Sequence, residues 1–518
     1  MPDSLLWQRY HRIIFYAIGF LLIFNLLAMG RVPEIPHADD GGYAAAAYQF
    51  WRTGHPGVPG YRDIVGLDQD IFAFGRTAAA FQGLFMWIAG VSLLAAMLPS
   101  YLAGIGLLAV TYGLARSLWD REHALLAMGI LGFSGIFFSA SRAARPDLLL
   151  ALAFVGALLL MASGSREVFS WHYPLAGVVM GVSGDLHING FLLAPVPLVF
   201  WLTLRRETLR LRVQIILIYS IGVLWGVAFW LAVHYWPNPE SFMKQIAIFG
   251  EKTHGIRIAN LGLLGAIHGE VQRYLSWFWW AKLHRHLFEG LIILGCGLGV
   301  IIWGGRKERA LFVAWLSVFW ISVFFMANPS GWYLIYVWPI FALWVARGFF
   351  AAYQTRAKRW AVTALCILFA GYLGNLALWT GKAFSGPSYT VISQELRSMI
   401  HQEASVVAGG EWWFALYGRD FTDAQHNQFQ ALLAKEKGEA MPSSWEYAWR
   451  RWRWNYAVAY GDIQAMLDTE VPLEQALSSI GIWREREIRE VRAFAINHCR
   501  VLKRIRTAYT PVLILEIK

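Results

Sequence analysis

Apolar residues occur in runs of membrane-spanning length along most of the first 380 residues. The first run, residues 13–30, reads IIFYAIGFLLIFNLLAMG without a charged residue. A helix of about 20 such residues crosses the hydrocarbon core of a bilayer. Repeated runs predict a polytopic membrane protein, and the first is long enough to remain as an anchor. Eleven spans are predicted, at residues 12–30, 98–117, 122–140, 147–163, 173–186, 189–204, 213–235, 287–304, 310–327, 332–350 and 360–379.

The fifth and sixth spans are short and are separated by the polar stretch GDLHING. They could form one kinked helix. However, both flanks are basic, with Arg166 before the pair and RRETLRLR (205–212) after it. Lys and Arg collect on the cytoplasmic side of a membrane, so both flanks are expected on one side, which requires two spans.

Basic residues cluster in the short loops between spans. If there are eleven spans, these loops all lie on the side of the N-terminus, which is then cytoplasmic, and the C-terminus is extracytoplasmic. The loop 236–286 departs from this pattern, because it is expected outside and carries several basic residues; the rule is weaker for long loops. The clustered residues are Arg9, Arg12, Arg116, Arg121, Arg306, Lys307, Arg309, Arg356, Lys358 and Arg359.

The predicted external side holds three notable segments. They are the loop 31–97, the turn SRAARPD (141–147) and the aromatic-rich loop 236–286. External loops of such length are usually functional. Within the first, the apolar stretch 72–96 is interrupted by Arg76 and Gln82, which predicts an interfacial helix and not a span.

The tail after residue 380 has a different character. It holds 17 Lys and Arg against 16 Asp and Glu, so nearly all of the net charge of +11 belongs to the membrane part. ASVVAGG, NYAVAY and TPVLILEIK read as strands and VPLEQALSSIG as a helix. The sequence therefore predicts a membrane domain over 1–380 and a small extracytoplasmic α/β domain over 381–518.

Composition agrees with this division. The chain is 57% hydrophobic and only 15% charged, whereas soluble proteins carry about a quarter charged residues. This excludes a large soluble core. Because the basic residues are accounted for by topology, no nucleic-acid partner is expected. The three cysteines show neither a disulfide framework nor a metal-binding spacing.

Four motifs on the external side occur in a recognisable order. They are an acid pair in HADDGGYAAAAYQFW (37–51), SRAARPDLLLALA, HINGFLLAP and GWYLIYVWPIFAL. The chain thus resembles the bacterial branch of the GT-C glycosyltransferases, and more narrowly the family-39 protein mannosyltransferases and the lipid A aminoarabinose transferases. The resemblance implies a cell-membrane enzyme. Such an enzyme moves a sugar from a polyprenyl-phosphate donor to a lipid, glycan or protein acceptor on the extracytoplasmic face.

The same resemblance implies roles for particular residues. It places Asp39 at the catalytic aspartate, Asp40 where many members have Glu, and Tyr43 at a common tyrosine. Asp147 falls on the acid of the second motif. Many members also have a Lys-Pro-Pro cluster where this chain reads FAFGRTAAAF. Arg76 could replace that lysine in contacting phosphate, although its register is off by a residue or two.

The acid pair has a chemical and a structural interpretation. A sugar transfer needs a general base to take the proton of the acceptor hydroxyl and cationic groups to stabilise the leaving phosphate. A neighbouring like charge and partial burial both raise a carboxylate pKa, which favours Asp39 as the base. On a helix Asp40 would point about 100° away and could shape the loop. The alternative is a helix cap, which explains one acid and not the second.

The turn 141–147 and the fifth–sixth hairpin supply further candidates. Arg142 and Arg145 could hold the donor phosphate, or could merely anchor the turn at the headgroup level, with Asp147 starting a helix after Pro146. His187 and Asn189, at the hairpin tip, are candidate substrate contacts; an ordinary interfacial role is the alternative.

Metal binding stays open in the sequence. His268, His284 and His286 cluster without a common zinc spacing. Asp39 and Asp40 could hold a divalent cation together with the donor phosphate, although the resembling families are mostly treated as metal-independent. No metal ligand is assigned.

Two other functions are compatible with the pattern. A transporter or flippase of a lipid-linked sugar would carry charged or broken helices near the membrane midplane, whereas the acids here lie at span ends. A polymer ligase using a diphosphate-linked glycan would place basic and histidine residues in a late external loop, and the loop 236–286 has such residues.

Overall fold

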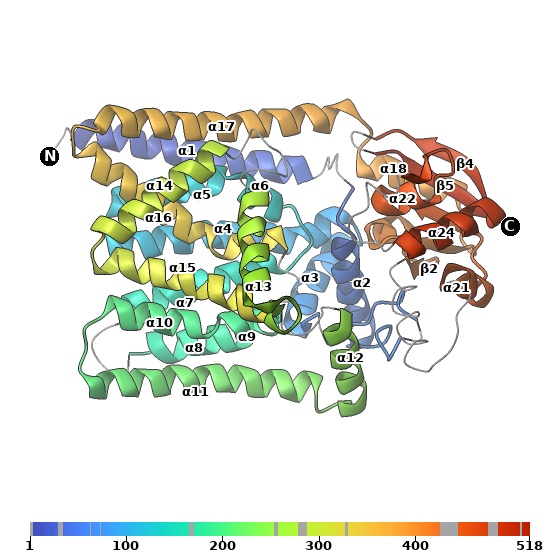
Figure 1. The fold of residues 1–518 in the computed structure, drawn as a ribbon, viewed down its shortest axis with the longest axis horizontal. Coiled ribbons are helices and arrows are strands. Elements are labelled where there is room, and N and C mark those ends of the chain that lie inside the picture. The colour runs from blue at the N-terminus through green and yellow to red at the C-terminus, as the bar shows by residue number, and fades with distance from the viewer. Residues whose placement is uncertain are drawn as a thin grey trace.

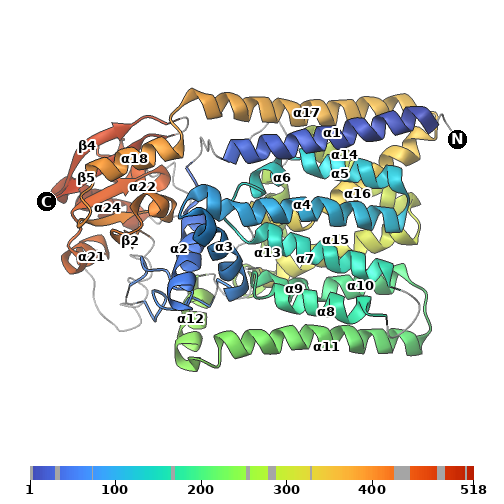
Figure 2. The same cartoon turned by 180° about the vertical axis from the view of Figure 1, so that it is seen from behind.

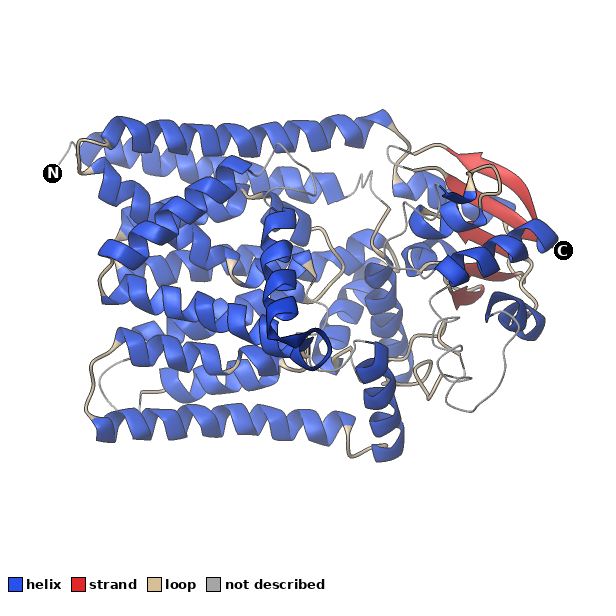
Figure 3. Cartoon of the chain, viewed as in Figure 1, coloured by secondary structure: helices blue, strands red, loops and turns tan. Residues whose placement is uncertain are grey.

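The computed structural model describes residues 4–29, 35–62, 64–72, 74–164, 170–252, 257–277, 287–326, 330–424, 444–474, 485–507 and 510–518. It is a bundle of long helices with a small mixed sheet at one end (Figures 1 and 3). The fold is therefore all-α in the membrane part with a C-terminal α/β domain, as predicted.

Each predicted span coincides with one helix or with two consecutive short ones. Five of these helices, α1, α4, α11, α15 and α17, are long and apolar enough on their own to cross a membrane. The helices are α1 (Ser4–Met29), α4 (Leu93–Leu118), α5 with α6 (Arg121–Phe133, Gly135–Ala140), α7 (Asp147–Ser163), α8 (His172–Ser183), α9 with α10 (Asn189–Leu193, Pro195–Leu204), α11 (Leu209–His234), α14 (Leu287–Trp303), α15 (Arg306–Phe325), η2 with α16 (Gly331–Tyr336, Trp338–Tyr353) and α17 (Lys358–Ser385).

The outer helices present apolar side chains away from the bundle. On α11, Ile221, Leu224 and Trp225 are exposed, whereas α7 is apolar and buries most of its side chains. Apolar surface of this kind is stable in lipid and costly in water. The chain is therefore a membrane protein, with α7 in the core of the bundle and α11 at its lipid-facing surface.

The two ends of the bundle differ. The N-terminus and the turn between α16 and α17 lie at one end, and the C-terminal domain lies at the other (Figures 1 and 2). The helices α2 (Ala38–Thr53) and α12 (Pro239–Lys252) lie across the C-terminal-domain end. Two further helices, α3 (Arg76–Ala89) and α13 (Arg257–Leu275), pack there against α2 and α15 respectively.

The expected interfacial helix at 72–96 is shorter than predicted. Helix α3 ends before Gly90, whose φ of 80° is unfavourable for other residues. The Ser92 side chain then accepts a hydrogen bond from the Ala95 N–H at 3.2 Å and starts α4, so the second span begins at Leu93 and not at residue 98.

The C-terminal domain contains a five-stranded sheet in the order β2-β1-β3-β5-β4. Strand β1 (Ser405–Ala408) is parallel to β2 (Asp420–Asp423) and β3 (Tyr456–Ala459). Strand β5 (Val512–Ile517) is antiparallel to β3 and to β4 (Cys499–Ile505). The three predicted strands are β1, β3 and β5. The predicted helix at 471–481 lies mostly outside the described residues. The remaining elements are α18 (Tyr389–Met399), η3 (Gly410–Trp412), α19 (Trp413–Leu416), α21 (Ser444–Trp452), α22 (Gly461–Leu467) and α24 (Glu485–His498).

The C-terminal domain docks on the first external segment. Helix α2 packs against η3 so closely that a Cβ added to Gly41 would lie 1.7 Å from the carbonyl oxygen of Gly410. The Asp423 N–H donates to the Gly60 carbonyl at 3.2 Å, and Arg62 pairs with Asp420. The start of α2 is therefore held by the C-terminal domain as well as by the bundle.

We expect the C-terminus to lie outside the cytoplasm, because the basic short loops gather at the opposite end of the bundle. An alkaline phosphatase fused after Lys518 should be active, and the same reporter fused after Trp303 should be inactive. An inactive fusion at Lys518, with an active cytoplasmic reporter there, would reverse this orientation.

We expect Gly41→Ala to loosen the C-terminal domain, because its methyl group cannot fit against a backbone carbonyl. Overpacking of this kind costs about 1–3 kcal/mol, which should lower the unfolding temperature of the purified protein. Gly156→Ala is the control, because a Cβ added at Gly156 would meet no neighbouring atom of the described residues within 4 Å. Equal unfolding temperatures for the two variants would show that the Gly41 contact does not hold the domains together.

Candidate active site

Helix α2 begins with an N-terminal cap formed by His37, which precedes the helix, and Asp40, in its first turn. The backbone N–H of Asp39 donates to His37 Nδ1 at 3.2 Å, and the backbone N–H of His37 donates to Asp40 Oδ2 at 2.8 Å. This reciprocal arrangement is a capping box, here with histidine in the place where serine or threonine is usual. Capping therefore uses Asp40 and leaves the Asp39 carboxylate for another contact.

Asp40 also connects α2 to the turn between α6 and α7. Its second oxygen, Oδ1, accepts a hydrogen bond from the Ala144 N–H at 2.8 Å. With one oxygen on each backbone donor, Asp40 is buried and fixes the position of the turn relative to α2. The structure thus gives Asp40 a shaping role in the loop.

Arg145 lies between the carboxylates of Asp39 and Asp147. Its Nη1 bonds Asp39 Oδ2, and its Nε bonds Asp147 Oδ2 at 2.7 Å. The Tyr336 hydroxyl donates to the other Asp147 oxygen at 3.0 Å. Asp39, Asp40, Arg145 and Asp147 are named the acid–arginine cluster below.

Within this cluster, Asp39 is the accessible member. The Asp39 side chain is 43% exposed, whereas the side chains of Arg145 and Asp147 are 4% and 3% exposed, and Asp40 is buried. A substrate reaching the cluster from the surface therefore meets Asp39 first, and meets Arg145 only where it adjoins Asp39.

The surroundings separate the pKa values of the two adjacent acids. Burial alone would raise the pKa of Asp39, but the His37 ring, whose Nδ1 is 3.4 Å from Asp39 Oδ2, and the charge of Arg145 hold it below its ordinary range. Burial raises the pKa of Asp40 to about 6 despite the charges of Arg145 and His37. The Asp39 carboxylate in turn raises the pKa of His37, because it stabilises the protonated ring. Asp39 is thus a carboxylate at neutral pH and, while Arg145 holds it, a weak base.

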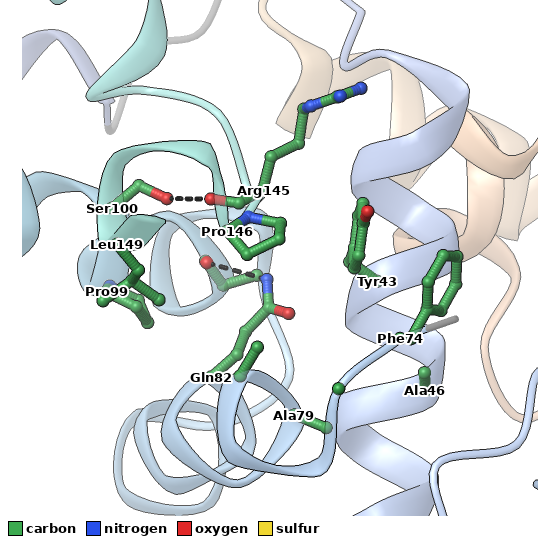
Figure 4. Close-up of a pocket in the computed structure, with 13 residues that line it drawn as sticks. Tyr43, Ala46, Phe74, Ala79, Gln82, Pro99, Ser100, Arg145, Pro146 and Leu149 are labelled. Atoms are coloured by element: carbon green, nitrogen blue, oxygen red, sulfur yellow. Dashed lines mark hydrogen bonds between the residues drawn. The ribbon is translucent and has the colours of Figure 1, made fainter. Parts of the chain in front are cut away.

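Tyr43 lies on the same side of α2, with its ring 4.2 Å from that of Phe74. It lines a small cavity together with Arg145, Pro146 and Gln82 (Figure 4). The cavity has a volume of about 10 Å³, which is about the space of one water molecule. It is too small to hold a sugar.

Arg142 and Arg145 occupy different surroundings, although both belong to the turn 141–147. The Arg142 guanidinium lies between the rings of Phe138 and Trp379, 4.0 and 3.9 Å from their centroids. Its Nε donates to the Phe138 carbonyl at 3.2 Å. Arg145 therefore makes the ion pair with Asp39, whereas Arg142 is held by aromatic rings and a backbone carbonyl.

His187 and Asn189 lie beside the cluster. The His187 ring is 5.5 Å from that of Tyr333, and its Nδ1 accepts from the Asn189 N–H at 3.2 Å. Burial lowers the pKa of His187, although the nearby Asp147 charge opposes this effect. The charge of Asp147 therefore acts on His187. Beside it, the ring of Tyr333 stacks on that of Tyr336.

Arg76 does not join the cluster. Its Nη2 donates to Asp70 Oδ2 at 2.6 Å, and its backbone N–H donates to Asp185 Oδ1 at 3.2 Å. Arg76 is the first residue of α3, and Asp185 caps that helix by also accepting from the Thr77 N–H at 2.8 Å. The expected contact of Arg76 with the donor phosphate has no support in this geometry.

Several residues of the site were not predicted. His37 directly precedes the acid pair, and Tyr336 lies in the motif GWYLIYVWPIFAL, so their positions carried a signal. Asp185 lies in GDLHING, whose polar residues indicated only a break between two spans. Among the described residues no three His, Cys, Asp or Glu side chains gather as metal ligands; His284 and His286 lie outside those residues.

The comparisons with known proteins agree with the fold. Residues 77–236 match the family model described as dolichyl-phosphate-mannose-protein mannosyltransferase. The structure is similar to ArnT from Cupriavidus metallidurans bound to undecaprenyl phosphate, with a TM-score of 0.60 and 13% identity over 99% of this chain and 98% of that one. Its apo form gives a TM-score of 0.62 at 12% identity, covering 98% of both chains.

A second similar structure comes from an archaeon. The oligosaccharyltransferase AglB from Archaeoglobus fulgidus, in complex with an inhibitory peptide and a dolichol-phosphate, has a TM-score of 0.51 and 12% identity. The match covers 89% of this chain and 72% of that chain. A comparison with curated protein sequences finds no match.

The geometry predicts energetic coupling between Asp39 and Arg145. Removing Arg145 leaves the buried Asp147 charge unpaired, which costs about 3–5 kcal/mol for a buried ion pair, so Arg145→Gln should destabilise the protein. Because Asp39→Asn removes part of the same network, the double variant should lose less than the sum of the single losses. Unfolding by a denaturant in detergent measures the coupling, expected at about 0.5–3 kcal/mol.

The matched control combines Asp39→Asn with Arg142→Gln. Among the contacts of the described residues, the Arg142 guanidinium packs on Phe138 and Trp379, whereas Asp39 pairs with Arg145, so the two effects should add to within about 0.5 kcal/mol. Additive losses for both pairs would contradict the central place of Arg145.

Proposed function

We propose that this protein, a membrane protein of the GT-C glycosyltransferase fold, transfers a sugar from a polyprenyl-phosphate donor to an acceptor on the extracytoplasmic face. The observation that carries the proposal is the acid–arginine cluster, which puts one accessible carboxylate against a buried guanidinium at the end of a membrane bundle. Lipid phosphates in two similar structures, ArnT and AglB, support the donor class.

The reaction is a direct displacement at the anomeric carbon. The acceptor oxygen forms a bond to that carbon, the bond to the phosphate oxygen breaks, and the polyprenyl phosphate leaves with the electron pair. Asp39 takes the proton of the acceptor hydroxyl and later releases it to water. A single displacement of this kind inverts the configuration of the anomeric carbon.

Arg145 links donor binding to the strength of the base. In the resting arrangement its charge holds the pKa of Asp39 low. A donor phosphate that takes over part of the Arg145 contact weakens that hold and makes Asp39 more basic. The base would then become effective only when the donor is present. The donor sugar itself binds on the exposed side of Asp39, because the cavity beside Tyr43 has room for only a water molecule.

The charge balance limits how the phosphate can bind. Asp39 and Asp147 pair with one guanidinium, Asp40 adds a third carboxyl group beside them, and His37 adds a positive charge only when protonated. A further anion is repelled by this excess of negative charge. A divalent cation that accompanies the phosphate would offset it. A cation bound to Asp39 itself would lower the pKa of the base, so no metal ligand is assigned.

We expect Asp39→Asn to abolish most transfer while the protein still inserts and binds donor. Loss of a general base costs roughly a hundred- to ten-thousandfold in rate. The quantity to measure is sugar transfer from a purified polyprenyl-phosphate sugar, chosen from the lipid that mass spectrometry finds accumulated in a deletion strain. Asp462→Asn, an exposed carboxylate at the start of α22, is the control and should keep full activity.

Near-normal turnover of Asp39→Asn at saturating acceptor would reduce the residue to a part of the helix cap. Donor that crosses the membrane without being cleaved would instead favour the flippase interpretation. Asp40→Asn is a less clean variant than Asp39→Asn. Both Asp40 oxygens accept from backbone N–H groups, and an amide NH2 facing one of them leaves a buried donor unsatisfied, at about 1–3 kcal/mol.

A further inference from the structure

A second and much larger cavity lies at the same end of the molecule. It has a volume of about 590 Å³ and opens between the C-terminal half of α2, the segment 55–72, and the junction of α11 with α12. This volume lies within the range of about 300–1,000 Å³ that small-molecule sites occupy. The acid–arginine cluster contributes none of its lining, so it is a separate site, named the lateral cavity below.

The lining of the lateral cavity is rich in neutral hydrogen-bonding groups. Gln49, Gln69, Asn238 and Ser241 contribute amides and a hydroxyl. In the part of the chain that the structure describes, the side-chain amides of Gln49 and Gln69 make no hydrogen bond. Each amide offers two donors and one acceptor oxygen to a ligand.

The floor of the lateral cavity carries polar groups that are held in place. Asp70 pairs with Arg76 at 2.6 Å and with His55 at 3.3 Å, and His234 is hydrogen-bonded to Asp185. Asp70 Oδ1 and His234 Nδ1 have no hydrogen-bond partner among the described residues, but both atoms are buried beneath the cavity surface. The floor is therefore fixed in shape, and the polar groups that a ligand can reach are the amides and the hydroxyl of the lining.

An aromatic pair adds an apolar patch. Phe72 and Phe242 line the lateral cavity, and their ring centroids are 4.7 Å apart. Hydroxyl-rich but partly apolar ligands such as sugars combine both kinds of contact, because the C–H faces of a sugar ring pack on aromatic rings. The mixture therefore favours a saccharide over a purely polar ion.

Charge separates the two substrates of the proposed reaction. The acidic residues that line the lateral cavity are Asp68 and Asp70, and Asp70 is already paired with Arg76. No Lys or Arg of the described residues lines the cavity. Because phosphates are held in proteins mainly by cationic groups, this lining suits a neutral saccharide better than the phosphate end of the donor.

The position of the lateral cavity relates it to Asp39. Gln49 follows Asp39 by ten residues on α2, and a helix rises about 1.5 Å per residue, so the two lie about 15 Å apart along one rigid element. We infer that the lateral cavity binds a neutral saccharide portion of the acceptor, a few sugar rings away from the hydroxyl that reacts at Asp39. That the saccharide belongs to an acceptor rests on the proposed function, but its binding can be measured without any transfer.

The test uses the purified full chain in detergent and saturation-transfer NMR with maltotriose, cellotriose and mannotriose as neutral probes and glucose 1-phosphate as the anionic probe. At least one trisaccharide should bind the wild type. The double variant Gln49→Ala/Gln69→Ala should bind it at least about tenfold more weakly, because two hydrogen bonds of about 1 kcal/mol each are lost. Gln354→Ala, an exposed glutamine at the opposite end of the bundle, should bind as the wild type does.

Three results would overturn the inference. They are no trisaccharide binding to the wild type, equal binding by the double variant, and displacement of the trisaccharide by glucose 1-phosphate at lower concentration than by the trisaccharides themselves. Because the glutamines lie at a cavity surface, unchanged unfolding temperature confirms that the double variant is folded. A protein that binds trisaccharides and transfers no sugar contradicts the proposed function alone.

Discussion

The burial of one positive charge organises the end of the bundle on which the C-terminal domain lies. A guanidinium as buried as that of Arg145 is stable only with carboxylates around it. Those carboxylates come from different places, Asp39 from the start of α2 and Asp147 from the start of α7. The Ser100 hydroxyl on α4 donates to the Arg145 carbonyl at 2.7 Å, and Tyr336 on η2 fixes Asp147. A surface helix and three elements of the bundle therefore meet at a single ion network.

The same network gives two adjacent acids different tasks. Asp40 uses both oxygens to accept from backbone N–H groups, so it holds the geometry and offers little to a substrate. Asp39 makes its strong contact with a side chain that a ligand can compete for. Asp39 is therefore the acid whose partner a ligand can exchange, and Asp40 is the acid whose partners are fixed. Two adjacent acids are tolerated here because each has its own partners: Asp39 pairs with Arg145, and Asp40 accepts from two backbone N–H groups.

The sequence predicts the spans well because hydropathy is a local property and the bilayer sets one length for all of them. It also identifies Asp39, Asp40, Arg145 and Asp147, but as two separate motifs. Their contact joins positions more than a hundred residues apart, which only the packing of α2 on the α6–α7 turn creates. Arg142 and Arg145 are equivalent in the sequence. They differ in the structure because Trp379, on the last span, covers one of them.

The placement of Arg76 and of two strands could not be read from the sequence, for physical reasons. Arg76 lies one residue from a segment that lines the small cavity, yet the start of α3 directs it to Asp70, because Asp185 caps that helix. Strand β2, with the sequence DFTD, was missed because aspartate is rare in strands. Its burial by the domain, and the pairing of Asp420 with Arg62, override that local preference. Strand β4 carries three basic residues and lies at the sheet edge, where charge is tolerated.

Helix α2 connects the features of this end of the molecule. Its first turn carries the acid pair, Gly41 meets the C-terminal domain, Tyr43 faces the small cavity, and Gln49 lines the lateral cavity. Because a helix is rigid over this length, the distances between these points are set by the backbone and not by loop conformation. The C-terminal domain packs against the start of α2. It therefore helps to fix the position of Asp39 and of the lateral cavity, which α2 joins. The domain can therefore influence the position of the acid–arginine cluster while contributing none of its four residues.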